Sequence, residues 1–313
     1  MKILFFGLGS IGIRHAKLIK QLYPSYELFA YRTWNGQLNN QELSYITSFN
    51  DLQKAYSIKP DVVFITNPTS FHVKTAILAA NNNCHLFIEK PLSNSKEGIE
   101  ELISIVNKKK LISLIGCNMR FHPIILKIKN MLLNKNYGRI LNFYVRCGSY
   151  LPNWRPQQDY SKSYSARKEL GGGVMLDLIH EIDYSQWLFG DFIQINGRRS
   201  KLSNLKIETE DFAEMLITTD RNIYGYIQLD YFSIRPERII TIVFENAIIK
   251  GDLINNSLYI YFNGKEIIEK VNIDRNYTYK QQLKYFFDCI DKGIKTFNSI
   301  EEGYKVLKYV LKI

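Results

Sequence analysis

Short apolar runs alternate with amphipathic runs over the first 120 residues. The apolar runs are rich in β-branched and aromatic residues, and the runs between them repeat apolar residues at helical spacing. Strand–helix alternation of this length predicts right-handed β–α–β units and therefore a parallel sheet covered by helices on both faces. The predicted strands are 2–6, 27–31, 61–65, 85–88 and 111–117, and the predicted helices are 11–23, 51–57, 73–81 and 96–108.

The hydrophobic pattern changes after residue 120. A helical run at 123–133 precedes a long strand at 139–150, a loop at 151–167 and a second helix at 173–189. The rest predicts a large, mainly antiparallel open sheet, so we expect an α/β chain with domains at 1–120 and 121–298. Residues 299–313 are a candidate to pack back on the first domain. Further strands are expected at 210–218, 223–232, 238–245, 247–252, 257–262 and 265–271, and closing helices at 278–292 and 300–312.

The composition is that of a folded globular protein, with 46% apolar and 23% charged residues in 313. The net charge of +11 suits an anionic cofactor or substrate, but the basic residues form no stripe with aromatics, so we expect no nucleic-acid partner. No apolar window approaches the roughly 20 residues of a membrane helix. Cys84, Cys117, Cys147 and Cys289 form no CxxC pair, and the histidines lack ligand spacing. We therefore expect reduced thiols, a cytoplasmic protein and no metal.

A glycine-rich turn follows the first predicted strand. Gly7, Gly9 and Gly12 form the pattern G-x-G-x-x-G, with Ser10 and Ile11 opening the predicted helix. In this setting the first glycine allows a tight turn, the second lets a diphosphate approach the backbone, and the third lets helix and strand pack closely. The first amides of the helix then face the anion. The sequence therefore predicts a bound dinucleotide.

The end of the second predicted strand indicates which dinucleotide binds. Chains that bind NAD usually carry Asp or Glu there, where it accepts hydrogen bonds from the ribose 2′-hydroxyl. This chain has Arg32 and Thr33, and no acid before Glu42. Because a guanidinium can pair with a 2′-phosphate, the sequence favours NADP. Binding of NAD, with Arg32 as a solvated strand-end residue, stays open.

Two polar segments follow the strands predicted at 61–65 and 85–88. Ligands bind at the carboxyl ends of strands in sheets of this kind, so we expect both segments to contact the coenzyme. The residues concerned are Asn67, Pro68, Thr69, His72, Glu89, Lys90 and Pro91, to which Arg120 is added from the later segment Arg-Phe-His-Pro.

These segments, together with the glycine triplet at 171–173 and the helix after it, which carries Asp177, His180 and Asp183, resemble the glucose–fructose oxidoreductase/inositol dehydrogenase (Gfo/Idh/MocA) family. The resemblance covers nearly the whole chain. It implies a Rossmann domain followed by an α/β domain whose open sheet often makes oligomer contacts, hence a homo-oligomer, either dimer or tetramer. Members of the family mostly oxidise or reduce a sugar or cyclitol hydroxyl with NAD(P).

The resemblance also implies roles for individual residues. Lys90 matches the lysine that lies near the reacting hydroxyl, and Pro91 matches a proline that is often cis. An ammonium group can hold the substrate oxygen and stabilise alkoxide character while hydride leaves the carbon. His180 matches a general base, and its ordinary pKa near 6.5 suits proton transfer. A hydrogen-bonded core histidine is the alternative interpretation of His180.

The helix departs from the family pattern at Asp177, which is also expected in the catalytic and substrate-binding set. The family more often places three residues between the Asp and the His, whereas two separate Asp177 from His180. Positions i and i+3 still share a helix face. Asp183 is a rival partner for the imidazole, or a residue that serves helix packing.

The loop before the glycine triplet carries aromatic and arginine side chains, which suit sugar rings and anionic groups. The sequence of this loop is similar to that of a bacterial subgroup of the family associated with surface-sugar biosynthesis. This similarity implies a nucleotide-linked or acidic sugar as substrate. The expected substrate-binding residues there are Tyr150, Trp154, Arg155, Tyr164 and Arg167, in addition to Lys90 and His180.

Three functions stay open at this point. The first is a sugar dehydrogenase or reductase. The second is a glycoside hydrolase or eliminase that reduces and reoxidises a bound NAD within each turnover. The third is a cofactor-sensing protein without catalysis, which the presence of both Lys90 and His180 argues against.

Overall fold

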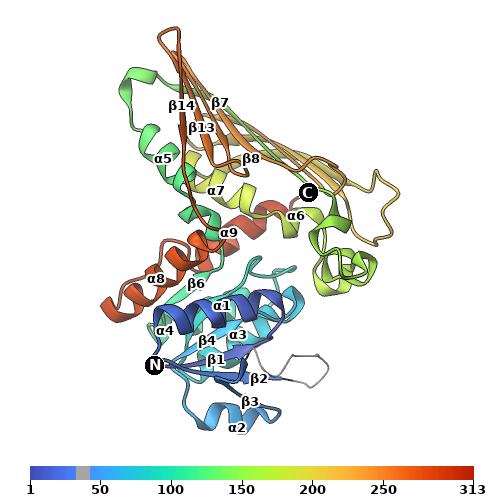
Figure 1. The fold of residues 1–313 in the computed structure, drawn as a ribbon, viewed down its shortest axis with the longest axis vertical. Coiled ribbons are helices and arrows are strands. Elements are labelled where there is room, and N and C mark those ends of the chain that lie inside the picture. The colour runs from blue at the N-terminus through green and yellow to red at the C-terminus, as the bar shows by residue number, and fades with distance from the viewer. Residues whose placement is uncertain (33–42) are drawn as a thin grey trace. The chain divides into compact units, whose positions relative to one another are not determined.

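The computed structural model describes residues 1–32 and 43–313, and the chain forms two compact units. The first contains Met1–Gly116 and Tyr279–Leu307, and the second contains Cys117–Thr278 and Lys308–Ile313. The chain therefore returns to its first unit after building the second (Figure 1).

The first unit is built on a six-stranded sheet in the order β3-β2-β1-β4-β5-β6, and every neighbouring pair is parallel. Apolar β-branched and aromatic residues favour these strands, and β4 is buried along its whole length, as expected of a strand covered on both faces. The strands are β1 (Lys2–Phe6), β2 (Glu27–Tyr31), β3 (Ile46–Phe49), β4 (Val62–Ile65), β5 (His85–Ile88) and β6 (Ser113–Ile115). The helices are α1 (Ser10–Leu22), α2 (Leu52–Ser57), α3 (His72–Asn81), α4 (Ile99–Lys108), α8 (Tyr277–Lys292) and α9 (Ile300–Val310).

Aromatic rings form much of the core of this unit. Phe64 of β4 stacks on Phe87 of β5 with ring centroids 4.4 Å apart, and Phe286 of α8 meets Phe87 edge-on at 5.5 Å. Phe287, the next residue of α8, is equally buried in the same cluster. Burial of each ring contributes about 2–3 kcal/mol. The sheet of the first unit therefore holds α8, which the expected domain boundary at residue 298 had left with the second domain.

The second unit contains an eight-stranded sheet in the order β14-β13-β12-β11-β7-β10-β9-β8. Only the pairing of β7 with β10 is parallel among the described strand pairs, so the sheet is mainly antiparallel. The strands are β7 (Ile140–Gly148), β8 (Phe192–Ser200), β9 (Phe212–Thr219), β10 (Tyr224–Asp230), β11 (Glu237–Phe244), β12 (Ala247–Asp252), β13 (Ser257–Phe262) and β14 (Lys265–Lys270).

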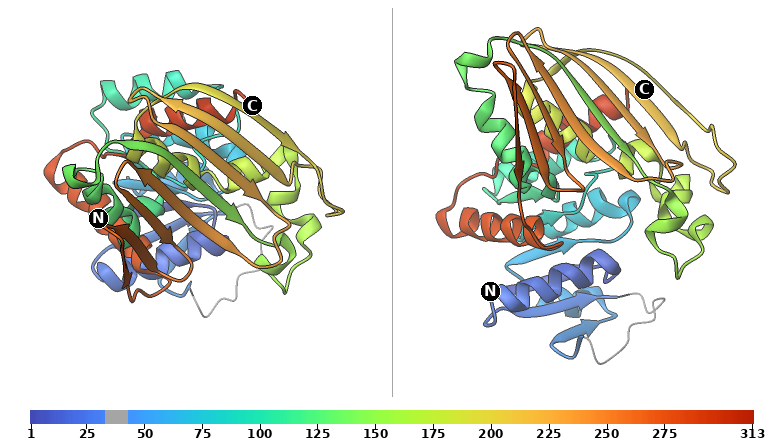
Figure 2. Two further views of the ribbon diagram at one scale, coloured as in Figure 1. Left: turned by 90° about the horizontal axis from the view of Figure 1, so that it is seen from above. Right: turned by 45° about the horizontal axis from the view of Figure 1, so that its top comes forward.

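Helices cover one face of this sheet and leave the other uncovered within the unit (Figure 2). Along β7, Phe143, Val145 and Cys147 are buried and Tyr144 and Arg146 are exposed, which is the period of two expected of a half-covered strand. Phe143 stacks on Phe189 of α7 with centroids 4.1 Å apart. The covering helices are α5 (Pro123–Met131), α6 (Val174–Asp177) and α7 (His180–Phe189).

The element types expected from the sequence are confirmed, with four differences. The helix expected at 173–189 is two helices, because Leu178 adopts φ −95° and ψ 29°, outside the helical range. Strands β3 and β8 were not expected. Their sequences, Ile-Thr-Ser-Phe and Phe-Ile-Gln-Ile-Asn-Gly-Arg-Arg-Ser, carry two and three apolar residues, and each strand lies at a sheet edge. Strand β6 is also shorter than the run at 111–117. Among the described residues, the helices are too short or too polar to cross a membrane.

Candidate functional site

The three glycines after β1 are glycine for different reasons. Gly7 has a φ of +96°, and a Cβ there would lie 2.7 Å from the Asn67 nitrogen. A Cβ on Gly12 would overlap the Gly7 carbonyl oxygen and lie 2.7 Å from Thr66 Oγ1. A Cβ on Gly9 would meet no heavy atom within 4 Å among the described residues. The fold itself therefore requires Gly7 and Gly12, whereas Gly9 faces open space.

The open space lies at the N-terminus of α1. Gly9 is the N-cap residue, with extended dihedral angles of −73° and −172°, and its carbonyl accepts the first helical hydrogen bond from Ile13 at 2.9 Å. The first amides of a helix have no partner within the helix, and they carry the positive end of its dipole. This end of α1, which begins with Ser10 and Ile11, can hold the diphosphate of a dinucleotide.

Arg32 lies at the carboxyl end of β2, where the sequence predicts contact with the adenine ribose. Its backbone nitrogen donates to the Phe49 carbonyl at 2.9 Å, and its side chain is half-buried. Thr33, predicted to bind the same part of the coenzyme, lies outside the described residues.

An imidazole joins the two polar segments that follow β4 and β5. His72 Nδ1 lies 2.8 Å from the Pro91 carbonyl oxygen, and its Nε2 lies 2.9 Å from the Asn67 carbonyl oxygen. The ring is buried, and burial lowers its pKa although both carbonyls favour the protonated form. The Lys90–Pro91 peptide bond is cis, as the family resemblance implies. His72 therefore fixes the backbone on both sides of the predicted coenzyme edge.

A buried carboxylate holds the Lys90 segment from the other side. Glu89 Oε1 lies 2.6 Å from Nε2 of His15 in α1, and Glu89 Oε2 accepts from the Lys90 backbone nitrogen at 3.3 Å. Gly116 leaves room for this carboxylate, because a Cβ there would lie 3.0 Å from Oε1. Glu89, expected to contact the coenzyme, thus connects α1 to the chain at Lys90.

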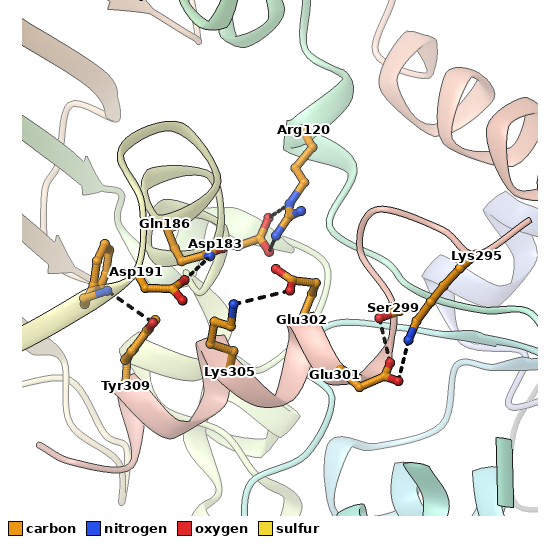
Figure 3. A network of polar contacts seen from close by, with 11 residues as sticks. Arg120, Asp183, Gln186, Asp191, Lys295, Ser299, Glu301, Glu302, Lys305 and Tyr309 are labelled. Atoms are coloured by element: carbon orange, nitrogen blue, oxygen red, sulfur yellow. Dashed lines mark hydrogen bonds and ion pairs between the residues drawn. The ribbon is translucent and has the colours of Figure 1, made fainter. Parts of the chain in front are cut away.

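Helices α6 and α7 carry three buried carboxylates, of which Glu181 pairs with Arg238 at 2.7 Å and the two singled out by the sequence, Asp177 and Asp183, have other partners. Asp177 accepts a 2.6 Å hydrogen bond from the Tyr231 hydroxyl. Asp183 accepts two hydrogen bonds from Arg120, at 2.9 Å from Nε and 2.8 Å from Nη2 (Figure 3). His180, the first residue of α7, is also buried, with 9% of its surface exposed. Arg120, expected at the coenzyme, is fully buried in this bidentate pair.

The predicted substrate loop runs through four short 3₁₀ helices at Leu151–Trp154, Tyr160–Lys162, Tyr164–Ala166 and Lys168–Leu170. Trp154 Nε1 donates to Ser149 Oγ at 2.8 Å, and its ring meets Tyr231 edge-on at 5.3 Å. The indole is 38% exposed, so one part is fixed and another faces outward. Arg167 forms an exposed ion pair with Glu169 at 2.5 Å.

The structure thus brings Trp154 close to Asp177 through Tyr231, a residue that the sequence analysis missed. Tyr231 directly follows β10, is fully buried and belongs to no short motif. Of the other predicted loop residues, Tyr150 and Tyr164 are half-buried and Arg155 is exposed. Only the strand pairing brings residue 231 to the loop at 151–154, where the Leu151 nitrogen donates to the Tyr231 carbonyl at 2.9 Å.

The strand order of the first unit, with a glycine turn between β1 and α1, defines a Rossmann-type dinucleotide-binding protein. Residues 1–117 match the model of the oxidoreductase family with an NAD-binding Rossmann fold, and residues 125–250 match the GFO/IDH/MocA C-terminal domain. The chain therefore belongs to the GFO/IDH/MocA oxidoreductase family.

Several family relatives are named for what they oxidise. The chain is 23% identical to myo-inositol 2-dehydrogenase of Thermotoga maritima over 98% of its own length and 93% of that protein. It is 31% identical to levoglucosan dehydrogenase of Pseudarthrobacter phenanthrenivorans, but over 44% of this chain and only 35% of that relative. A solved levoglucosan dehydrogenase in complex with NADH superposes with a TM-score of 0.86 at 18% identity, covering 100% of this chain and 96% of the other.

Proposed function

We propose that this protein transfers a hydride between a nicotinamide coenzyme and a hydroxyl or carbonyl carbon of a sugar or sugar derivative. The observation that carries this proposal is the open space at Gly9, at the N-terminus of α1, in a unit whose other two turn glycines are sterically required. The names of the relatives, which include a levoglucosan and an inositol dehydrogenase, support a polyhydroxylated substrate.

The amides at Ser10 and Ile11 would hold the coenzyme diphosphate, since helix geometry and dipole favour an anion there. The carboxyl end of β2 would hold the adenine ribose, and NADP would be preferred because Arg32 offers a guanidinium where NAD-binding chains carry an acid. The segments at Asn67–Thr69 and at Glu89–Pro91 line the coenzyme edge, with His72 and Glu89 fixing their backbone.

Lys90, His180 and Asp177 carry the chemistry. The bound nicotinamide accepts or supplies the hydride. In the oxidation direction, the Lys90 ammonium donates a hydrogen bond to the substrate hydroxyl oxygen. It stabilises the negative charge that develops on this oxygen as the hydroxyl proton leaves. His180 accepts that proton, and Asp177 supports the charge that the imidazole gains. In the reduction direction His180 returns the proton to the same oxygen.

Arg120 and Asp183 have a structural role in this proposal. Their bidentate pair is buried on both sides, with side-chain exposures of 0% and 3%. Removing one partner of such a pair leaves an uncompensated buried charge, which costs about 3–5 kcal/mol. We therefore assign the support of His180 to Asp177.

The substrate binds over Trp154, whose half-exposed indole offers an apolar face to a sugar ring. Arg155 and the net charge of +11 favour an anionic substrate, either a nucleotide-linked or an acidic sugar. Tyr150, Tyr164 and Arg167 shape the same loop.

The protein assembles as a homo-oligomer through the uncovered face of the eight-stranded sheet. Large apolar side chains are exposed on it, and apolar surface of this kind marks association sites. Light scattering of the pure protein tests this, and the Leu216→Arg variant should shift the mass to that of one chain. The exposed residues include Tyr144, Leu216, Tyr224, Ile248 and Tyr261.

The experiment that tests the reaction is a screen of nucleotide sugars, sugar acids and cyclitols with NAD⁺ and NADP⁺, followed at the nicotinamide absorbance band. Turnover with net reduction of the coenzyme is expected. Turnover without a net absorbance change would instead establish internal coenzyme recycling, as in a hydrolase or eliminase. Coenzyme binding without turnover on any substrate would indicate a sensing protein.

A further inference from the structure

Tyr231 joins three parts of the second unit that are distant in sequence. Its hydroxyl donates to Asp177 Oδ2 at 2.6 Å, and its ring meets Trp154 at 5.3 Å and 89°. Its backbone nitrogen donates to the Asp211 carbonyl at 2.9 Å, and its carbonyl accepts from Leu151 at 2.9 Å. Because side chain and backbone are both fixed, the hydroxyl has one orientation.

We propose that Tyr231 is a positioning residue that keeps Asp177 ionised and oriented, and that connects this carboxylate to the Trp154 loop where the substrate binds. This role of Tyr231 rests on the proposed function, in which Asp177 supports the charge on His180. Donation of a short hydrogen bond favours a charged carboxylate over a protonated one. It also commits one oxygen, so rotation of the carboxylate is blocked.

Burial makes this hydrogen bond strong and durable. Asp177 is 3% exposed and Tyr231 is fully buried, so water does not compete for either partner. Two causes hold the pKa of the Tyr231 hydroxyl well above its ordinary value of 10.0. The larger is burial, and the second is the negative charge of Asp177. The hydroxyl therefore remains a donor throughout the pH range in which the protein works.

Other titratable groups face this pair. Glu210 adds negative charge near Tyr231, and its Oε1 accepts from the Met175 nitrogen in α6 at 3.4 Å. His180 follows Asp177 by three residues. Because Glu210 acts on Tyr231, the residue that Asp177 accepts from, its negative charge would also disfavour ionisation of Asp177, since like charges repel. The Tyr231 hydrogen bond opposes that effect, which gives the hydroxyl a function beyond filling space.

The test compares Tyr231→Phe with Tyr184→Phe. Both remove one buried hydroxyl that hydrogen-bonds a carboxylate, since Tyr184 donates to Glu181 Oε1 at 3.5 Å within α7. For Tyr231→Phe we expect kcat to fall roughly tenfold, the lost value of one hydrogen bond to a charged group. Protonation of Asp177 removes its support of His180, so it adds a second acidic pKa to the kcat/KM profile, below that of His180, and this second pKa should rise by about one unit. Tyr184→Phe should match the parent protein in both the rate and the profile.

A second measurement does not depend on turnover. Carboxyl ¹³C NMR of the full chain should give Asp177 a pKa about one unit higher in Tyr231→Phe than in the parent. If the profile and the Asp177 titration are both unchanged, the positioning role is wrong. If Asp177→Asn retains full activity, then the assignment of Asp177 fails instead. An inactive Asp177→Asn beside a normal Tyr231→Phe would leave the proposed reaction intact and refute only the role of Tyr231.

Discussion

Substitution of Gly9 and of Gly12 by alanine should separate coenzyme binding from stability. A Cβ on Gly9 enters open space, at φ −73° and ψ −172°, which alanine adopts without strain. Alanine lowers the entropy of the unfolded chain, worth about 0.4–1 kcal/mol, but it is a poorer N-cap than glycine by a similar amount. The two effects oppose each other, so the free energy of unfolding should change by less than about 1 kcal/mol.

The affinity for the coenzyme, unlike the stability, should change strongly in Gly9→Ala. The added methyl group occupies the path by which a diphosphate approaches the amides of α1, so we expect Kd to rise about 10- to 100-fold, or about 1.4–2.7 kcal/mol. Gly12→Ala instead drives a Cβ into the Gly7 carbonyl, and overpacking of this kind costs about 1–3 kcal/mol. Its Tm should fall by several degrees.

Thermal unfolding and isothermal titration calorimetry with NADP⁺ and NAD⁺ measure the two quantities on the same samples. We expect Gly9→Ala to keep its Tm within about 3 °C and lose affinity, and Gly12→Ala to lose Tm. A Gly9→Ala protein that binds coenzyme as tightly as the parent would refute the assignment of this space to the diphosphate. An unchanged Tm for Gly12→Ala would refute the steric argument.

Three further predictions concern catalysis, selectivity and pH. Lys90→Ala should lower kcat at least about 100-fold and leave coenzyme Kd within about twofold, whereas Lys74→Ala on the exposed side of α3 should behave as the parent; equal losses would contradict the role of Lys90. Arg32→Asp should lower the preference for NADP over NAD at least about 10-fold in kcat/KM, and unchanged selectivity would remove Arg32 from the account. Burial lowers the pKa of His122 from 6.5 to about 4, so its stabilisation is complete above pH 6.5 and is lost as the pH falls towards 4. The loss should reach about 3 kcal/mol, and urea unfolding of His122→Asn across this range should show a smaller decline than the parent does.

Local patterns were sufficient to predict most of the fold. The spacing of apolar residues predicted β1, β2, β5, β12 and β13 to the residue, because each is bounded by turn residues or by a change of period. Periodicity could not tell which sheet would receive α8. Its apolar face, with Leu283, Phe286 and Phe287, would suit either core, and only the folded first unit contains the rings against which it packs.

The polar groups of the candidate site also fall into two sets, those that the sequence could identify and those that it could not. Those in contiguous motifs, such as Gly9 and Lys90, could be identified from the sequence because the motif fixes their place on a strand end. Partners of those residues could not. His15 reaches Glu89 across 74 positions, and Tyr231 reaches Asp177 across 54, so both contacts depend on helix packing or strand pairing that no local pattern specifies.

The most direct test of coenzyme binding at α1 is a crystal structure of the protein with bound NADP⁺ or NAD⁺. We expect diphosphate oxygens within hydrogen-bond distance of the backbone amides that follow Gly9, at the start of α1, and the adenine ribose beside Arg32. A dinucleotide bound elsewhere, with the space in front of Gly9 filled only by water, would contradict this expectation.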